Sequence, residues 1–176
     1  MNVSLFRPAE ALMAQYAAYH RDRRNIVTHF IGIPMIFAAI AVWLVFPLGR
    51  QWGAYGITAA WLMWALTSFW YLTRGDMLLG LATAVVNGLL VALAHRLADL
   101  APGWGLVGWQ LGAILFVVGW FFQFVGHYWE GRKPAFVDDI VGLLVGPMFV
   151  VGEGLMLVGL LTDMRRTIEA EVGPTR

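Results

Sequence analysis

Residues 123–134 read QFVGHYWEGRKP, and they close a long apolar run that begins at Trp104. From His127 onward, a histidine, a glutamate, two basic residues and a proline that disfavours further helix arrive within eight positions. A second transition between polar and apolar sequence lies near the N-terminus and carries His20 and His29. We expect the fold to bring both transitions to one face of a membrane, with a metal ion between them.

The composition is that of a membrane protein. Of the 176 residues, 60% are hydrophobic and 13% are charged, whereas a soluble domain has roughly 45–50% apolar and about 25% charged residues. The apolar residues form blocks close to the about 20 residues that a helix needs to cross a bilayer, which predicts an all-α integral membrane protein. No linker divides residues 1–176, so we expect one membrane domain: an interfacial amphipathic helix (1–27), a helical bundle (28–161) and a polar tail (162–176).

Composition also excludes several kinds of site and partner. The absence of cysteine excludes disulfides, zinc–thiolate sites and iron–sulfur clusters. A net charge of +1 gives no reason to expect a nucleic-acid partner. Residues 1–27 carry charged and aromatic side chains where a signal peptide needs a continuous apolar core, so the first membrane segment is expected to be a retained anchor.

Periodicity predicts the order of the helices. Over residues 8–24, Leu12, Tyr16 and Tyr19 recur at spacings of four and three, so they form one apolar stripe. We expect this stripe to lie in lipid at the membrane interface. The next blocks predict a bundle of four spanning helices. A tight polar turn joins the second span to the third, and a polar loop joins the third to the fourth. The spans are expected at about residues 28–48, 53–72, 77–93 and 104–125, and the loop at 95–105.

A fifth apolar run covers residues 136–161 and is unusual for a simple span. It is expected to be either one broken, kinked span or two half-helices that form a re-entrant hairpin. Irregular backbone at membrane depth needs shielding by protein or a cavity. The features that suggest a break are Asp138 and Asp139 at its start, Gly146-Pro147 in its middle and a buried acid, Glu153.

Lysine and arginine residues predict the orientation of the bundle. With alternating spans, one side carries Arg7, Arg21, Arg23, Arg24, Arg74, Arg132 and Lys133, and the other carries Arg50 and Arg96. The N-terminus is therefore expected to be cytoplasmic. This orientation places His20, His29 and His127 together at the cytoplasmic end and leaves His95 at the opposite end.

These three histidines are the candidate metal ligands. Imidazole is a common ligand of iron, zinc and copper. The alternative is that each ring simply sits at the membrane interface. Three of the four histidines fall on one side of the membrane, and a cluster of ionisable groups at membrane depth favours a functional site. The nine-residue separation of His20 and His29 matches no short metal motif.

Charged residues near the histidines are candidates for further roles. The carboxylates of Glu130, Asp138 and Asp139 are the candidate catalytic groups, because they can add metal ligands or orient the rings. Asp138 and Asp139 can alternatively cap the fifth apolar run. Arg132 and Lys133 are the candidate substrate-binding residues, since they can anchor a carboxylate or an anionic headgroup. They can also serve only as charges that set the topology.

Two motifs resemble those of a known membrane family. Residues 19–34, YHRDRRNIVTHFIGIP, resemble the YHxxxxNxxTHxxGIP opening of the family named after the fungal 2-hydroxy fatty acid dioxygenase. Residues 123–135 are similar to its second signature, although Trp129 replaces the usual phenylalanine before Glu130 and Phe136 stands where leucine is common. The resemblance covers nearly the whole chain.

The resemblance implies an iron(II)-dependent dioxygenase of fatty-acid α-oxidation. Members of this family convert a 2-hydroxy fatty acid and O2 to the fatty acid one carbon shorter, which in fungi serves phytosphingosine breakdown. The family's iron ligands correspond here to His20, His29 and His127. The implied partners are Fe(2+), a fatty-acyl substrate, O2 and the lipid bilayer.

Other functions remain open from the sequence. A different lipid-active metalloenzyme, such as a hydroxylase or a zinc hydrolase, would differ in its metal, since zinc has no redox chemistry. A non-catalytic transporter or scaffold is the alternative from another class. A broken fifth helix with a buried acid is found in transporters, although the chain shows no inverted repeat. The substrate chain length, the oligomeric state and the choice between a bacterial inner membrane and an endoplasmic-reticulum membrane also remain open.

Overall fold

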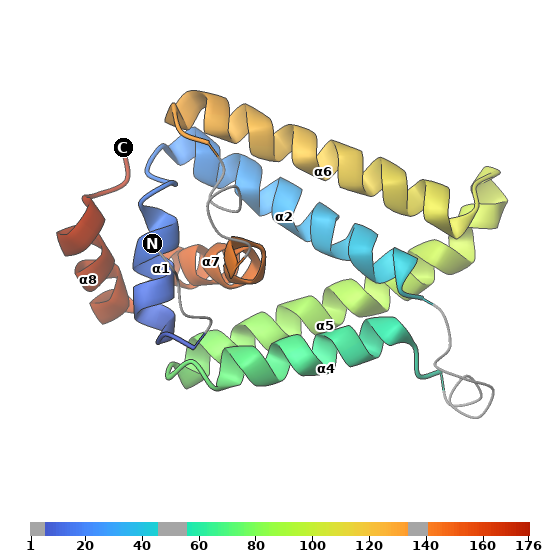
Figure 1. Ribbon diagram of the computed structural model, residues 1–176, viewed down its shortest axis with the longest axis horizontal. Helices are drawn as coiled ribbons and strands as arrows, with labels where there is room; N and C mark the ends of the chain where they lie inside the picture. The colour runs from blue at the N-terminus through green and yellow to red at the C-terminus, as the bar shows by residue number, and fades with distance from the viewer. Residues whose placement is uncertain (1–5, 46–55, 134–140) are drawn as a thin grey trace.

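The computed structural model describes residues 6–45, 56–133 and 141–176, and all regular secondary structure in these residues is helical (Figure 1). The predicted all-α fold is therefore confirmed for this part of the chain. Long helices lie along the molecule, whereas α7 is seen nearly end-on beside α1. The elements are α1 (Ala9–Ala17), α2 (Arg23–Trp43), α4 (Ala59–Leu72), α5 (Met77–Leu100), the 3-10 helix η1 (Ala101–Trp104), α6 (Gly108–Glu130), α7 (Val141–Leu157) and α8 (Thr162–Val172).

Three helices of the described chain are long and apolar enough to cross a membrane: α2, α5 with its η1 extension, and α6. The helix α4 has 14 residues, so it is about 21 Å long at about 1.5 Å per residue and falls short of a hydrocarbon core of about 30 Å. The four predicted spans are thus not confirmed. The second apolar block forms a shorter helix that begins at Ala59, after its N-cap Thr58, and packs against α5.

The fifth apolar run does not break where the sequence predicted. The helix α7 continues through Pro147, and Gly146 and Pro147 are both buried inside it. The hydroxyl of Tyr71 in α4 donates to the carbonyl of Leu144 at 2.9 Å, next to Leu143, whose carbonyl loses its helical donor at Pro147. The break comes later: α7 and α8 are bent by 112°, and Leu161 between them has a φ of 53°.

The N-terminal helix is shorter than predicted and packs inside the protein. The helix α1 ends at Ala17, and the next helix begins at Arg23 with Asp22 as its N-cap, whose side chain accepts from the backbone N–H of Arg24 at 2.8 Å. Leu12 and Met13 are at most 2% exposed because α1 packs against α7 and α8. The predicted contact of this apolar stripe with lipid is therefore not confirmed. The polar tail also forms a helix, α8, beside α1 (Figure 1).

The helices α2 and α6 pack closely through glycine. Gly112, Gly119 and Gly126 recur every seven residues on α6, and a Cβ at Gly119 would lie 2.9 Å from the carbonyl oxygen of Gly32 on α2. Small residues let two helix backbones approach in this way. Because the two helices run in opposite directions (Figure 1), the close packing brings the start of α2 to the end of α6.

Replacing Gly119 with alanine is expected to destabilise the protein by about 1–3 kcal/mol, the usual cost of overpacking a filled interface. The added Cβ would meet the Cγ1 of Ile36 at 2.7 Å and two backbone atoms of α2 at 2.9 and 3.1 Å, and the backbone cannot turn aside as a flexible side chain can. Thermal unfolding in detergent measures the effect. Gly108→Ala is the matched control on the same helix, because a Cβ there meets nothing within 4 Å. Equal unfolding temperatures for the two variants would contradict the tight α2–α6 contact.

Candidate metal centre

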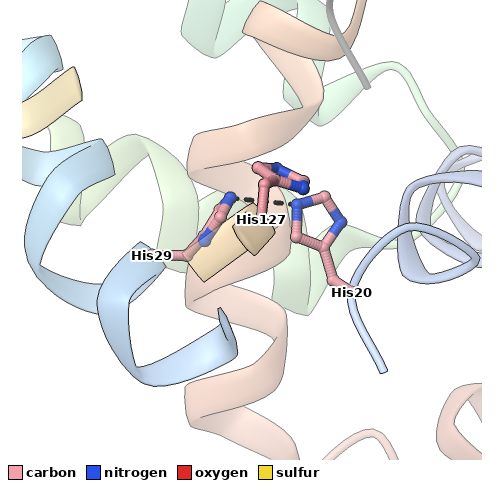
Figure 2. Close-up of side chains that lie close together, drawn as sticks. All are labelled: His20, His29 and His127. Carbon is pink, nitrogen blue, oxygen red and sulfur yellow. Dashed lines mark hydrogen bonds between the residues drawn. The ribbon is translucent and has the colours of Figure 1, made fainter. Parts of the chain in front are cut away.

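Three histidines from three different segments meet at one end of the bundle (Figure 2). His20 lies in the turn between α1 and α2, His29 lies in the second turn of α2, and His127 lies in the last turn of α6. One nitrogen of each ring lies within 4.8 Å of the others. All three side chains are buried, with exposed fractions of 0%, 0% and 5%. The structure thus brings together the three residues that the sequence placed at the same end.

The fourth histidine, His95, lies apart from this cluster. It sits inside α5, which continues to Leu100 instead of giving way to the predicted loop. Its Nδ1 lies 2.9 Å from the carbonyl oxygen of Val91, and its Nε2 lies 3.0 Å from the hydroxyl of Thr58. The ring stacks on Trp61 at a centroid distance of 5.5 Å. These local contacts account for His95 without a metal.

Backbone carbonyls fix the orientation of His20 and His29. The Nδ1 of His20 lies 2.7 Å from the carbonyl oxygen of Tyr16, and the Nδ1 of His29 lies 2.8 Å from that of Asn25. A carbonyl oxygen only accepts, so each Nδ1 must carry the proton. In a neutral ring, the Nε2 atom then presents a lone pair.

The two Nε2 atoms of His20 and His29 lie 3.0 Å apart and face each other (Figure 2). With both Nδ1 atoms protonated, neither Nε2 of a neutral ring can donate to the other. An extra proton between them is disfavoured, because burial lowers the pKa of His20 well below its ordinary value and the neighbouring His29 lowers it further. A metal ion accepts both lone pairs, and metal binding requires the neutral form of histidine.

His127 completes the donor set. Its ring centroid lies 4.9 Å from that of His20 and 5.0 Å from that of His29. Its Nδ1 is buried and has no hydrogen-bond partner in the described part of the chain, and a buried polar atom without a partner is costly. A metal held by the three rings would satisfy this nitrogen as well. The residues therefore fit a metal ion, and three imidazoles suit iron, zinc, copper or nickel.

Aromatic side chains enclose the ring of His20. Tyr16 stacks on it at a centroid distance of 4.2 Å with an interplanar angle of 3°. Phe149 of α7 lies 5.2 Å from the same ring. Sequence reasoning placed Tyr16 only in an apolar stripe. Residues four apart on a helix share a face, so the spacing of Tyr16 and His20 was a signal for their contact. The rings do stack, although α1 ends at Ala17, before His20.

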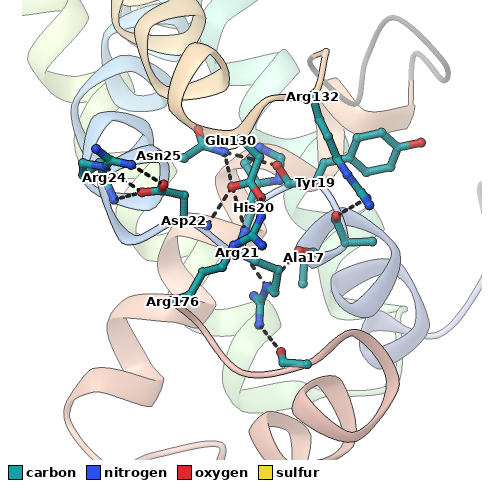
Figure 3. Close-up of polar contacts among 12 residues, drawn as sticks. Ala17, Tyr19, His20, Arg21, Asp22, Arg24, Asn25, Glu130, Arg132 and Arg176 are labelled. Carbon is teal, nitrogen blue, oxygen red and sulfur yellow. Dashed lines mark hydrogen bonds and ion pairs between the residues drawn. The ribbon is translucent and has the colours of Figure 1, made fainter.

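Glu130 connects the end of α6 to the turn that carries His20 (Figure 3). Its Oε2 accepts from the backbone N–H groups of Arg21 at 2.9 Å and Asp22 at 2.7 Å, and from the Nδ2 of Asn25 at 3.1 Å. Its Oε1 lies 3.6 Å from the Nη2 of Arg176. The carboxylate is only 6% exposed and is engaged by protein donors. These contacts favour a positioning role over the predicted catalytic one.

The other predicted site residues lie outside the cluster. Arg132 is exposed, and its Nη1 donates to the carbonyl of Ala18 at 2.7 Å, just beyond the end of α1. Lys133 is also exposed at the end of α6. Asp138 and Asp139 lie outside the described residues, so their roles stay predictions.

A buried arginine and a partly buried glutamate were not assigned from the sequence. Arg21 follows His20, and its Nε donates to the carbonyls of Ala17 at 2.9 Å and His20 at 3.0 Å. Its Nη2 lies 3.6 Å from Glu153 of α7, which identifies a partner for this acid. Arg21 also donates through Nη1 to the carbonyl of Gly173 beyond α8. The contacts of Arg21 with Glu153 and Gly173 join the turn to segments much later in the chain, so no local sequence pattern could reveal them.

Comparisons with known proteins agree with the motifs. Residues 6–157 match the family model described as 2-hydroxy-palmitic acid dioxygenase Mpo1-like. The chain is also 30% identical over 164 residues to the 2-hydroxy-palmitic acid dioxygenase MPO1 of Saccharomyces cerevisiae, and the aligned region covers 89% of this chain and 85% of the yeast protein. No solved structure matches the chain. The matched residues include His20, His29 and His127, and the chain belongs to the 2-hydroxy-palmitic acid dioxygenase Mpo1-like family.

Proposed function

We propose that this protein is an iron(II)-dependent membrane dioxygenase that converts a 2-hydroxy fatty acid and O2 to the fatty acid one carbon shorter. The observation that carries the proposal is the pair of facing Nε2 atoms of His20 and His29, 3.0 Å apart, beside the Nδ1 of His127, which has no hydrogen-bond partner among residues 6–45, 56–133 and 141–176. The family supplies the substrate class, since the yeast relative is named a 2-hydroxy-palmitic acid dioxygenase.

The proposed reaction balances without a further reductant. The acid loses its carboxyl carbon as CO2, the carbon bearing the hydroxyl becomes the new carboxyl group, and one water forms. One O2 accepts the four electrons that this oxidation releases. Iron(II), when bound, supplies the redox chemistry that zinc lacks.

The chain's own residues hold and shield the site. The carbonyls of Tyr16 and Asn25 keep the Nε2 lone pairs of His20 and His29 directed at one point, as outer hydrogen bonds do for histidine ligands in general. Three protein nitrogens leave coordination positions for other ligands. The buried rings of Tyr16 and Phe149 exclude water from one side of the cluster.

Charged residues around the site have proposed supporting roles. Arg132 uses one nitrogen for the carbonyl of Ala18 and retains further N–H donors, so with Lys133 it is the candidate for attracting the substrate carboxylate. Glu130 positions the turn that carries His20. Asp138 and Asp139 stay candidate catalytic carboxylates. The excess of basic residues on this side supports a location of the site at the cytoplasmic face.

Protein purified without oxygen in detergent is expected to contain near-stoichiometric iron and to consume O2 only with a 2-hydroxy acid. The test compares 2-hydroxyhexadecanoic acid with hexadecanoic acid, which has the same chain and lacks the hydroxyl. Elemental mass spectrometry measures the metal, and gas chromatography measures a product one carbon shorter. Zinc in place of iron, without O2 consumption, would redirect the proposal to hydrolysis. No metal after reconstitution with iron(II) would contradict the metal centre.

A further inference from the structure

A cavity of about 160 Å³ begins at the histidine cluster and extends between α2, α6 and α7. Its lining includes His127 and Tyr16 at one end and Phe116 and Ile40 at the other. On α6 the lining residues follow a helical spacing of four, three and four, so they belong to one face of the helix. They are Phe116, Trp120, Gln123 and His127.

The cavity is polar near the histidines and apolar beyond them. Gln123 lies one turn before His127, lines the cavity and is only 5% exposed. Its Nε2 is buried and has no hydrogen-bond partner among the described residues, so its amide has capacity left for an oxygen of a ligand. The rest of the lining is aliphatic and aromatic. A ligand with a polar head and a long apolar tail matches this division.

The cavity of about 160 Å³ is long and narrow and can hold part of a long chain. Phe116 and His127 lie about three turns apart on α6, or about 16 Å along the axis at about 1.5 Å per residue. Ile36, Ile40 and Trp120 are only half-buried, so the apolar wall opens sideways to the outer surface of the bundle. Both helices that form this wall are long and apolar enough to cross a membrane. An acyl chain can therefore enter from the lipid without passing through water.

We infer that this cavity binds the acyl chain of the substrate, with the 2-hydroxycarboxylate toward His127 and the methyl end toward Phe116 and Ile40. The inference rests on the proposed function, because the proposed substrate supplies the head and the tail. It assigns Gln123 as a contact for the polar head, and it assigns the α7 wall as the part that sets the width of the cavity.

Gly146 on α7 keeps the cavity open beside the polar end. A Cβ at this position would lie 3.2 Å from the Cδ1 of Ile33 and 3.3 Å from the hydroxyl oxygen of Tyr16. Both neighbours are side-chain ends that can shift slightly, so a larger residue would occupy the cavity without meeting backbone. Gly146 is therefore a specificity-determining position, since a bulky side chain there would separate the histidine end from the apolar end.

Photo-crosslinking tests the position of the acyl chain without requiring turnover. The probe is 2-hydroxyhexadecanoic acid with a diazirine at the end of its chain, added to metal-free and to iron-loaded protein. Labelled peptides are expected to carry the probe on Phe116, Trp120 or Ile40, with loss of label when unlabelled 2-hydroxyhexadecanoic acid competes. The exposed residues Val117 and Phe121 lie outside the lining face of α6 and provide the internal control. Label on those residues that resists competition would overturn the inference.

A matched pair of variants on α7 tests the width of the cavity. Gly146→Val is expected to reduce crosslinking and turnover of the long-chain acid by at least about tenfold, the discrimination that an apolar pocket gives for a single methylene, with iron content unchanged. Gly154→Val is the control, because a Cβ there meets only Phe30, at 3.7 Å. Wild-type crosslinking and turnover in Gly146→Val would overturn the inference.

A second variant covers the case in which Gly146→Val does not fold. Ile40→Trp fills the apolar end, so it is expected to shift the preferred substrate toward shorter 2-hydroxy acids, and an unchanged preference would overturn the inference.

The acyl-site inference and the dioxygenase proposal fail in different ways. Competed label in the cavity without iron or O2 consumption would reject the dioxygenase and retain the acyl site. Turnover with label only on the outer face would reject the acyl site and retain the dioxygenase.

Discussion

The His29→Ala variant is expected to lose most of its metal and all measurable turnover. His29 presents an Nε2 lone pair fixed by the carbonyl of Asn25, 2.8 Å from its Nδ1, and alanine removes that donor entirely. Loss of an outer hydrogen bond alone costs about 10–100-fold in metal affinity, so loss of the ligand should cost at least about 100-fold. Elemental analysis and competition with a chelator measure the affinity.

His95→Ala is the matched control for this experiment. It also removes a histidine from a helix of the same protein, but His95 contacts Thr58 and Trp61 at the other end of the bundle. Its metal content should equal that of the wild type. Equal metal loss in the two variants would mean that metal binding depends on the stability of the whole fold and not on the histidine cluster. Full metal retention by His29→Ala would contradict the site itself.

Replacing Glu130 with alanine is expected to destabilise the protein by roughly 3 kcal/mol or more, because each buried donor left unpaired costs about 1–3 kcal/mol. The donors that lose their acceptor are the backbone N–H groups of Arg21 and Asp22 and the side-chain amide of Asn25. His20 directly precedes Arg21, so the metal affinity should fall by about 10–100-fold as well. Thermal unfolding and metal competition measure the two effects.

Glu130→Gln separates the two roles of this residue. The glutamine keeps an oxygen acceptor of the same reach, so a positioning residue should retain most of the metal and most of the activity. A catalytic carboxylate that transfers a proton would instead lose turnover while the metal stays bound. The second result would restore the catalytic role that the sequence predicted for Glu130.

The sequence predicted the histidine cluster from local patterns of charge and apolar length. Charge distribution and apolar length together placed His20, His29 and His127 at one end, and the structure brings them together. Local patterns do not contain the contacts that shape the cluster. The carbonyls that orient His20 and His29 are backbone groups, and the acceptor role of Glu130 depends on a turn 109 residues earlier in the chain.

The errors in the fold have a common physical cause. An apolar stripe looks the same whether it faces lipid or protein, so the burial of α1 against α7 and α8 could not be predicted from periodicity. The proline at 147 suggests a break, but α7 continues through it with Gly146 and Pro147 buried in the packed bundle, and that packing is nonlocal. The late start of α4 at Ala59 is an exception, because it has local signals that the span prediction did not use: Gly56 has a φ of 69° and Thr58 is the N-cap.

The separation between Glu130 and the turn that it holds has a consequence for biosynthesis. His20 and His29 leave the ribosome long before His127, so the nascent chain carries two histidines of an incomplete site while the later helices are made. The fixed turn and the third nitrogen appear only after α6 has entered the membrane and docked on α2. Metal binding by all three histidines must therefore follow the docking of α6 on α2.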